Sequence, residues 1–96
     1  MLSKIALDIS KVKKEKLDLE ILRAGLIAEL DAINLYEQMA DMTQDKSIKK
    51  ILLDIAKEEK THVGEFQALL LERDKEQVKE LEAGKKEVKE ELSKKD

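Results

Sequence analysis

Apolar residues recur along residues 18–41 in alternating steps of four and three. These steps are typical of one face of an amphipathic helix, because residues three and four positions apart lie on the same side. A charged residue, Glu29, occupies a position where the pattern requires a hydrophobic side chain. The stripe consists of Leu22, Leu26, Glu29, Ile33, Tyr36 and Ala40.

The same spacing returns over residues 47–74 and predicts a second amphipathic helix. Two polar residues, Glu59 and His62, interrupt this second stripe. In a helix, a carboxylate and an imidazole three residues apart point the same way and lie about one turn apart, so both can reach one cation. The stripe consists of Ile48, Leu52, Ile55, Glu59, His62, Phe66 and Leu69.

The segment between the two stripes, residues 41–47, breaks the apolar period and is rich in residues that favour turns and helix N-caps. It predicts that the chain reverses near residue 45 and that the two helices pack antiparallel. Reflecting Glu29 through residue 45 gives position 61, which lies between Glu59 and His62. The three side chains are therefore expected to meet at one height on the facing stripes.

Two interpretations of these three polar residues are open. Buried polar side chains fix the register of some helical assemblies without binding a ligand. However, two carboxylates in one apolar seam repel each other unless one is protonated or a cation bridges them. Oxygen and imidazole ligands without any thiolate favour iron, manganese or zinc. We therefore predict that Glu29, Glu59 and His62 are metal ligands.

Composition narrows the fold class and excludes several functions. With 96 residues, 43% of them charged, 2% aromatic and none proline, the chain suits one small domain of long helices. The absence of cysteine excludes disulfides, iron–sulfur clusters and a rubredoxin-type iron centre. The 19 basic and 22 acidic residues are interspersed, so we expect no nucleic-acid partner. Neither a membrane span nor a signal peptide is recognisable, which predicts a soluble protein of the cytoplasm.

The segments on either side of the hairpin are less clearly patterned. Residues 1–17 form a lead-in with a few apolar residues. Residues 75–96 are rich in charge, and we expect either two short helical pieces separated near Gly84 or one frayed helix. A solvated tail or a linker is the alternative for this last segment.

Helix-capping residues and glycines predict where the helices begin and where they pack closely. Asp18 is the expected cap of the first helix, and Asp45 or Ser47 that of the second. Gly25 lies one turn before Glu29 on the same face, where a missing side chain lets another backbone approach; a merely tolerated helix glycine is the alternative. Gly64 lies off the stripe and is expected to mark close packing against another element.

The number of ligand-type residues indicates that a complete site needs two chains. A di-metal carboxylate bundle takes one Glu from each of two helices and a Glu-x-x-His pair from each of two more. This chain holds half of that set, and His62 is its single histidine. The expected fold is therefore all-α. It consists of an antiparallel helical hairpin, half of a ferritin-like four-helix bundle, plus a C-terminal helical segment, with the bundle completed by dimerisation.

Two stretches of the chain resemble the encapsulated ferritins. They are residues 22–38, which contain AELDAINLYEQ, and residues 51–66, which contain the EExxH block at the matching separation. The chain is particularly similar to the archaeal kind, in which this domain precedes an encapsulin shell protein. The resemblance covers roughly residues 18–74.

The resemblance implies a ferroxidase that oxidises Fe(II) to Fe(III) at a di-iron centre between two subunits, for iron storage inside an encapsulin nanocompartment in the cytoplasm. It implies that Glu29, Glu59 and His62 bind iron and that Tyr36 lies beside the centre as a further catalytic residue. Asp31 matches a metal-binding acid on the side where iron enters. The resemblance also implies homodimers assembled into an annular homodecamer, with the encapsulin shell protein as partner.

Other functions remain open at this stage. One is a different ferritin-like di-metal oxidase or peroxidase, similar to rubrerythrin without its rubredoxin centre, and the other is a non-catalytic helical assembly module. The chain departs from the family at Ala28, where members often carry an acid. Glu58 and Glu65 flank His62 at helical spacings and either orient its imidazole or are solvated surface acids, and Glu37 has the same status.

Overall fold

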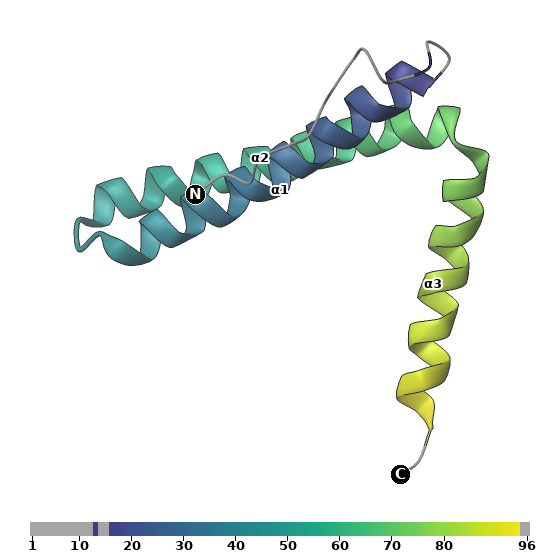
Figure 1. The fold of residues 1–96 in the computed structure, drawn as a ribbon. Helices are drawn as coiled ribbons and strands as arrows, with labels where there is room; N and C mark the ends of the chain where they lie inside the picture. The colour runs from purple at the N-terminus through teal and green to yellow at the C-terminus, as the bar shows by residue number, and fades with distance from the viewer. Residues whose placement is uncertain (1–12, 14–15, 95–96) are drawn as a thin grey trace.

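The computed structural model describes residues 13 and 16–94, and these form three helices without any strand. Helices α1 (Leu17–Met42) and α2 (Lys46–Arg73) form an antiparallel hairpin, and α3 (Lys75–Ser93) leaves it at an elbow (Figure 1). The predicted all-α hairpin with a C-terminal helical segment is confirmed. Most of the predicted lead-in, residues 1–17, lies outside the described residues.

The ends of the hairpin helices follow from local capping. Asp45 caps α2 as predicted, because its Oδ1 accepts hydrogen bonds from the backbone N–H groups of Ser47 and Ile48 at 2.9 and 3.0 Å. The chain therefore reverses over residues 43–45. The predicted cap of α1 is wrong: Lys16 occupies the N-cap position without a side-chain bond, and Asp18 lies in the first turn. There the carboxylate of Asp18 interacts favourably with the helix dipole.

A narrow apolar core lies between α1 and α2. Each of the six predicted stripe residues of α1 is buried or half-buried, which confirms that stripe. The predicted stripe of α2 is correct in its central part, but its end members, Ile48 and Leu69, are exposed. The contact face moves around α2 because a seven-residue repeat does not match 3.6 residues per turn. The buried apolar residues are Leu22, Ile33, Ala40, Ala56 and Leu70.

Gly25 makes room for an aromatic ring of the opposite helix. An ideal Cβ built on Gly25 lies 2.6, 2.7 and 2.8 Å from three ring carbons of Phe66, closer than real Cβ contacts. The close approach predicted at Gly25 is thus present, but the neighbour is a side chain rather than a backbone. The prediction for Gly64 is wrong within one chain, since nothing lies within 4 Å of an ideal Cβ there.

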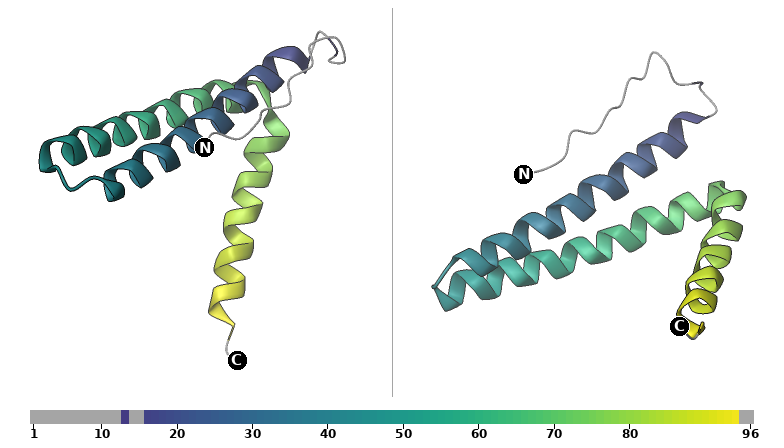
Figure 2. Two further views of the ribbon diagram at one scale, coloured as in Figure 1. Left: turned by 60° about the vertical axis from the view of Figure 1, so that its left-hand side comes forward. Right: turned by 60° about the horizontal axis from the view of Figure 1, so that its bottom comes forward.

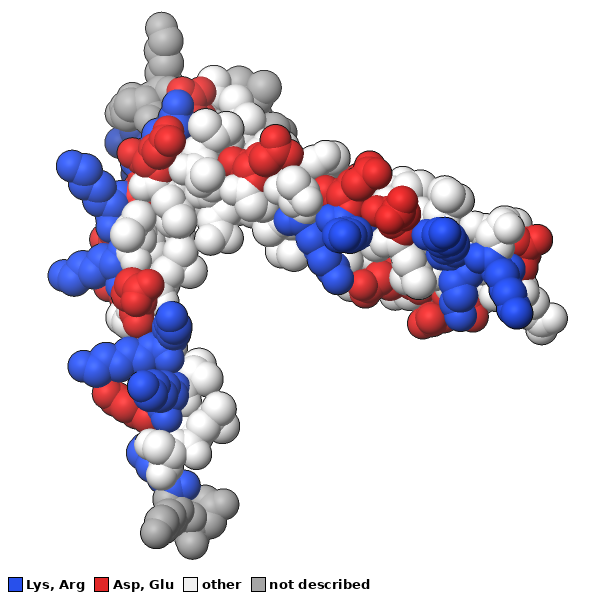
Figure 3. Space-filling model, turned by 180° about the vertical axis from the view of Figure 1, so that it is seen from behind, with Lys and Arg blue, Asp and Glu red and all other residues white. Residues whose placement is uncertain are grey.

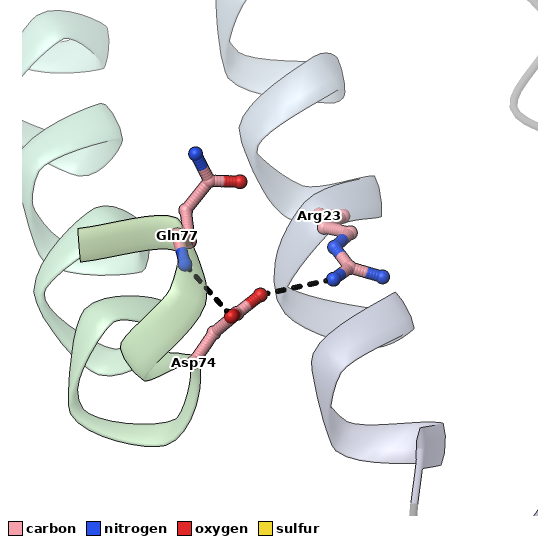
Figure 4. A network of polar contacts seen from close by, with 3 residues as sticks. All are labelled: Arg23, Asp74 and Gln77. Carbon is pink, nitrogen blue, oxygen red and sulfur yellow. Dashed lines mark hydrogen bonds and ion pairs between the residues drawn. The ribbon is translucent and has the colours of Figure 1, made fainter. Parts of the chain in front are cut away.

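Asp74 forms the elbow between α2 and α3. It is the single residue between the two helices, and its φ of −130° and ψ of 86° lie outside the helical region. Its Oδ1 accepts a hydrogen bond from the backbone N–H of Gln77 at 2.9 Å, and its Oδ2 pairs with Arg23 Nη2 of α1 at 3.1 Å (Figure 4). One carboxylate therefore caps α3 and also ties the elbow to α1.

Helix α3 is continuous, so of the two predicted arrangements the structure has the single helix and not two pieces separated near Gly84. A glycine inside a helix costs only about 1 kcal/mol relative to alanine. The cap at Asp74 and neighbouring Lys–Glu pairs, such as Lys86 and Glu90 at 4.0 Å, favour the helix. Both views of Figure 2 show α3 pointing away from the hairpin. Its exposed apolar residues are Val78, Leu81, Val88 and Leu92.

The described residues expose more large apolar side chains than they bury. The radius of gyration is 17.3 Å, against about 13 Å for a compact chain of this length, because the two arms lie apart. On the face shown in Figure 3, basic and acidic side chains are mixed along both arms. Within the described part of the chain, none of the helices is long and apolar enough to cross a membrane. Exposed apolar surface of this extent is typical of protein–protein contacts.

Candidate metal centre

Three ligand-type side chains converge midway along the hairpin. Glu29 comes from α1, and Glu59 and His62 come from successive turns of α2. The Nδ1 atom of His62 lies 3.5 Å from Glu29 Oε2 and 3.4 Å from Glu59 Oε2. One possible ligand atom from each residue lies within 4.8 Å of the other two. The expected meeting of the three side chains is therefore observed, and we call these residues the triad.

The triad is partly enclosed, and one of its oxygens lacks a hydrogen-bond partner. The side chains of Glu29 and Glu59 are each 18% exposed, whereas that of His62 is 45% exposed. Glu29 Oε2 is buried without a hydrogen bond, since its 3.5 Å contact with His62 exceeds the usual charge-assisted length of about 2.7–2.9 Å. A buried carboxylate oxygen without a partner costs free energy, and a bound cation offsets that cost. The donor atoms thus fit a divalent metal.

A pocket of about 340 Å³ opens beside the triad. Phe66 and Leu69 form its apolar wall, and no Lys or Arg is among the residues that line it. Low-polarity surroundings strengthen the attraction between a carboxylate and a cation. The lining residues are Glu29, His62, Glu65, Phe66 and Leu69.

Two residues predicted from the sequence lie outside the triad. Tyr36 is half-buried on the stripe of α1, seven residues after Glu29 and therefore roughly 10 Å further along the helix axis. Asp31 is also half-buried but follows Glu29 by two residues, which turns it about 200° around the helix. Asp31 does not belong to the group of ligand atoms within 4.8 Å. The catalytic role of Tyr36 and the metal-binding role of Asp31 remain predictions.

The three other acids near His62 differ in their surroundings. Glu37 forms an exposed ion pair with Lys60 at 3.3 Å, which is consistent with a surface acid. Glu58 is exposed, and Glu65 is exposed but lines the pocket. The carboxylates in contact with His62 Nδ1 are those of the triad itself. Helical spacing alone gave no means of separating Glu65 from Glu58, because both lie one turn from His62.

Comparison with known proteins identifies the family of the chain. A family model described as EncFtn-like matches residues 4–95. The chain belongs to the EncFtn-like family. The predicted resemblance to encapsulated ferritins is thereby confirmed, and the match extends beyond residues 18–74 on both sides.

Two relatives of this EncFtn-like chain carry encapsulin in their names. The ferritin-like-encapsulin shell fusion protein of Pyrococcus furiosus is 66% identical over 77 residues, which cover 80% of the chain and 22% of the relative. The encapsulin nanocompartment cargo protein EncC of Myxococcus xanthus is 38% identical over 72 residues, which cover 72% of the chain and 55% of the relative. The chain therefore spans about a fifth of the length of the first relative and about half that of the second.

A solved structure matches the EncFtn-like chain over nearly its whole length. It is the crystal structure of the encapsulated ferritin domain from Pyrococcus furiosus, with 52% sequence identity and a TM-score of 0.80. The match covers 91% of this chain and 94% of the solved one. The prediction of a ferritin-like helical hairpin is thus confirmed in both sequence and structure.

Proposed function

We propose that this EncFtn-like chain is a ferroxidase that oxidises Fe(II) to Fe(III) at a centre formed by two copies of the chain. The observation that carries the proposal is the convergence of Glu29, Glu59 and His62, with a buried oxygen of Glu29 that lacks a hydrogen-bond partner. The names of the relatives support a place inside an encapsulin compartment. As part of the proposal, this compartment lies in the cytoplasm and stores the oxidised iron.

The need for a second copy follows from the ligand count. A ferritin-like di-iron centre takes two Glu residues and two Glu-x-x-His pairs, and one hairpin supplies half of these. Large apolar side chains of the hairpin also remain exposed, among them Ile27, Leu30 and Leu69. A homodimer that joins two triads across a two-fold axis satisfies both requirements. On the basis of the family resemblance, we also propose that such dimers assemble into a homodecamer.

In this proposal Fe(II) is the substrate and dioxygen the oxidant. Two Fe(II) ions supply two electrons, and dioxygen takes these with two protons to give hydrogen peroxide and two Fe(III) ions. The carboxylates of Glu29 and Glu59 favour Fe(III) over Fe(II), because negative charge in a partly enclosed site stabilises the more highly charged ion. The half-exposed imidazole of His62 leaves the site accessible, so the product can leave. We assign Tyr36 to a position beside the centre and Asp31 to the side where iron enters.

Substitution of Glu59 by glutamine tests this function. Glu59→Gln is expected to lower the initial rate of aerobic Fe(II) oxidation by more than about 100-fold, since even a residue that only supports a metal ligand contributes about 10–100-fold. The matched control is Glu58→Gln, which changes an exposed neighbour outside the triad and is expected to retain the wild-type rate. The measurement is the ferric absorbance after Fe(II) is mixed with air-saturated buffer.

Two results would contradict the ferroxidase. Equal rates for Glu59→Gln and wild type would show that the triad is not the oxidation site and would favour a non-catalytic assembly module. Oxidation by hydrogen peroxide without any by dioxygen would favour a ferritin-like peroxidase instead.

A further inference from the structure

Helix α3 presents an apolar stripe to solvent within the described part of the chain. Val78, Leu81, Val88 and Leu92 are exposed, and Lys85 fills the remaining position of a pattern with steps of three, four, three and four. Such steps are typical of the seam of a helix that packs against a second helix. A helix of 19 residues gains most of its stability from such packing, so we expect an occupant for these residues, the α3 stripe.

Residues 2–12 of the sequence carry a stripe with matching spacing. Its apolar residues are separated by steps of three, four and three, as on one face of a helix. The first four positions of the α3 stripe have the same steps, which read identically in both directions, so antiparallel packing aligns all four positions. The facing pairs are Val12 and Val78, Ile9 and Leu81, Ile5 and Lys85, and Leu2 and Val88.

This pairing continues the register of the hairpin. Reflection through residue 45, which brings the triad together, also places Val12 opposite position 78. It places the elbow residue Asp74 opposite Lys16, the N-cap of α1. The N–H of Lys16 donates to the C=O of Lys13 at 2.9 Å, as in a turn. Both sides of the hairpin are therefore interrupted at the same level, and the chain before α1 can follow α3 around the elbow.

The charged member of the α3 stripe also has a suitable partner. Lys85 faces Ile5 in this pairing, and Asp8, one turn from Ile5, is the one acidic residue of positions 2–12. The stem of a lysine can lie along apolar surface while its ammonium group reaches a carboxylate. A second copy of α3 would have to compete with this tethered segment, whose effective concentration is on the order of millimolar.

We propose that residues 2–12 form a helix that packs antiparallel on the α3 stripe of the same chain. The two helices form one arm beyond the elbow, and this arm sets the direction of α3. The contact uses α3 rather than the hairpin face that holds the triad. It is therefore compatible with the proposed homodimer and does not depend on metal.

Disulfide cross-linking of the full chain in EDTA tests the proposal, since the sequence contains no natural cysteine. A variant with Ile9→Cys and Leu81→Cys is expected to form a disulfide within one chain, seen as a monomer on a non-reducing gel. The matched control combines Leu7→Cys with Leu81→Cys, because Leu7 is turned about 200° around a helix from Ile9. Equal disulfide yields from the two pairs would overturn the proposal. Disulfides between chains alone would assign the α3 stripe to a second copy and would overturn it too.

Hydrogen exchange gives a second readout without cysteines. Ile9→Asp places a charge in the packed seam and is expected to speed amide exchange in α3 at least about 10-fold, whereas Leu7→Asp should leave it unchanged. Equal exchange in Ile9→Asp and wild type would contradict the proposed contact. Both experiments are done without metal, so their failure would leave the ferroxidase in place, and loss of iron oxidation in Glu59→Gln would not bear on them.

Discussion

Replacement of Glu29 by methionine is expected to stabilise the metal-free protein and to abolish metal binding. The wild-type side chain places an oxygen in a buried position without a hydrogen bond, close to the carboxylate of Glu59. Methionine has a similar length and removes both the desolvation penalty and the repulsion. We expect the free energy of unfolding without metal to rise by about 1–3 kcal/mol, the usual cost of a buried polar group without a partner.

The metal-dependent part of the stability should change in the opposite direction. A metal at 100 times its dissociation constant stabilises the wild type by about 2.7 kcal/mol. Glu29→Met should lose this gain, because one of three ligands is missing. The measurement is thermal unfolding by circular dichroism in EDTA and in excess Mn(II). Glu37→Met is the matched control on α1, since Glu37 pairs with Lys60 at the surface and lies outside the triad.

A lower stability of Glu29→Met in EDTA would contradict this account. It would mean that the contact between Glu29 and His62 stabilises the hairpin in the absence of a bound cation. Thermal unfolding in Mn(II) tests the predicted loss of metal binding. If Mn(II) still raised the unfolding temperature of Glu29→Met, Glu29 would not be a metal ligand.

Alanine at Gly25 and alanine at Gly84 are expected to change stability in opposite directions. Both glycines lie inside helices, where Gly→Ala gains about 0.5–1 kcal/mol from backbone entropy alone. The Gly84 site is open, so Gly84→Ala should realise that gain. At Gly25 the new methyl group meets the ring of Phe66 at 2.6–2.8 Å, and overpacking of this kind costs about 1–3 kcal/mol. We expect a net loss for Gly25→Ala.

The substitution at Gly25 should also affect the pocket. Phe66 lines the pocket beside Glu29 and His62, so displacement of its ring disturbs the wall next to the triad. The measurements are urea unfolding of the two single variants and of Gly25→Ala combined with Phe66→Leu, in which the smaller side chain relieves the clash. Equal stabilisation by Gly25→Ala and Gly84→Ala would show that the ring moves aside freely and that Gly25 has no packing role.

The hairpin and the triad were predictable because their signals are local and periodic. The two stripes fix which faces of α1 and α2 meet, and Asp45 fixes where the chain reverses. These features place Glu29 opposite Glu59 and His62 without knowledge of any other contact. The stripe of α2 was less accurate at its ends, where Ile48 and Leu69 are exposed and Leu70 is buried instead, since helical periodicity departs slightly from the seven-residue repeat.

The elbow and the pocket were not predictable in the same way. Asp74 and Gln77 have the spacing of a capping box and mark the start of α3 locally. The partner of Asp74 is Arg23, however, 51 residues earlier in the chain, and no local pattern connects them. The close packing predicted at Gly64 is absent within one chain, and a glycine alone does not say whether a neighbour approaches. The direction of α3 and the place of Glu65 at the pocket likewise depend on tertiary geometry.

The most direct test of the central claim, that two copies of the chain complete one two-iron centre, is native mass spectrometry after anaerobic addition of Fe(II). The account predicts two irons per pair of chains, found in dimers and larger even-numbered assemblies but not in monomers. Because the two chains share the ligands, metal binding and assembly are coupled. Monomers that each bind one iron, or dimers that stay free of iron when it is in excess, would contradict it.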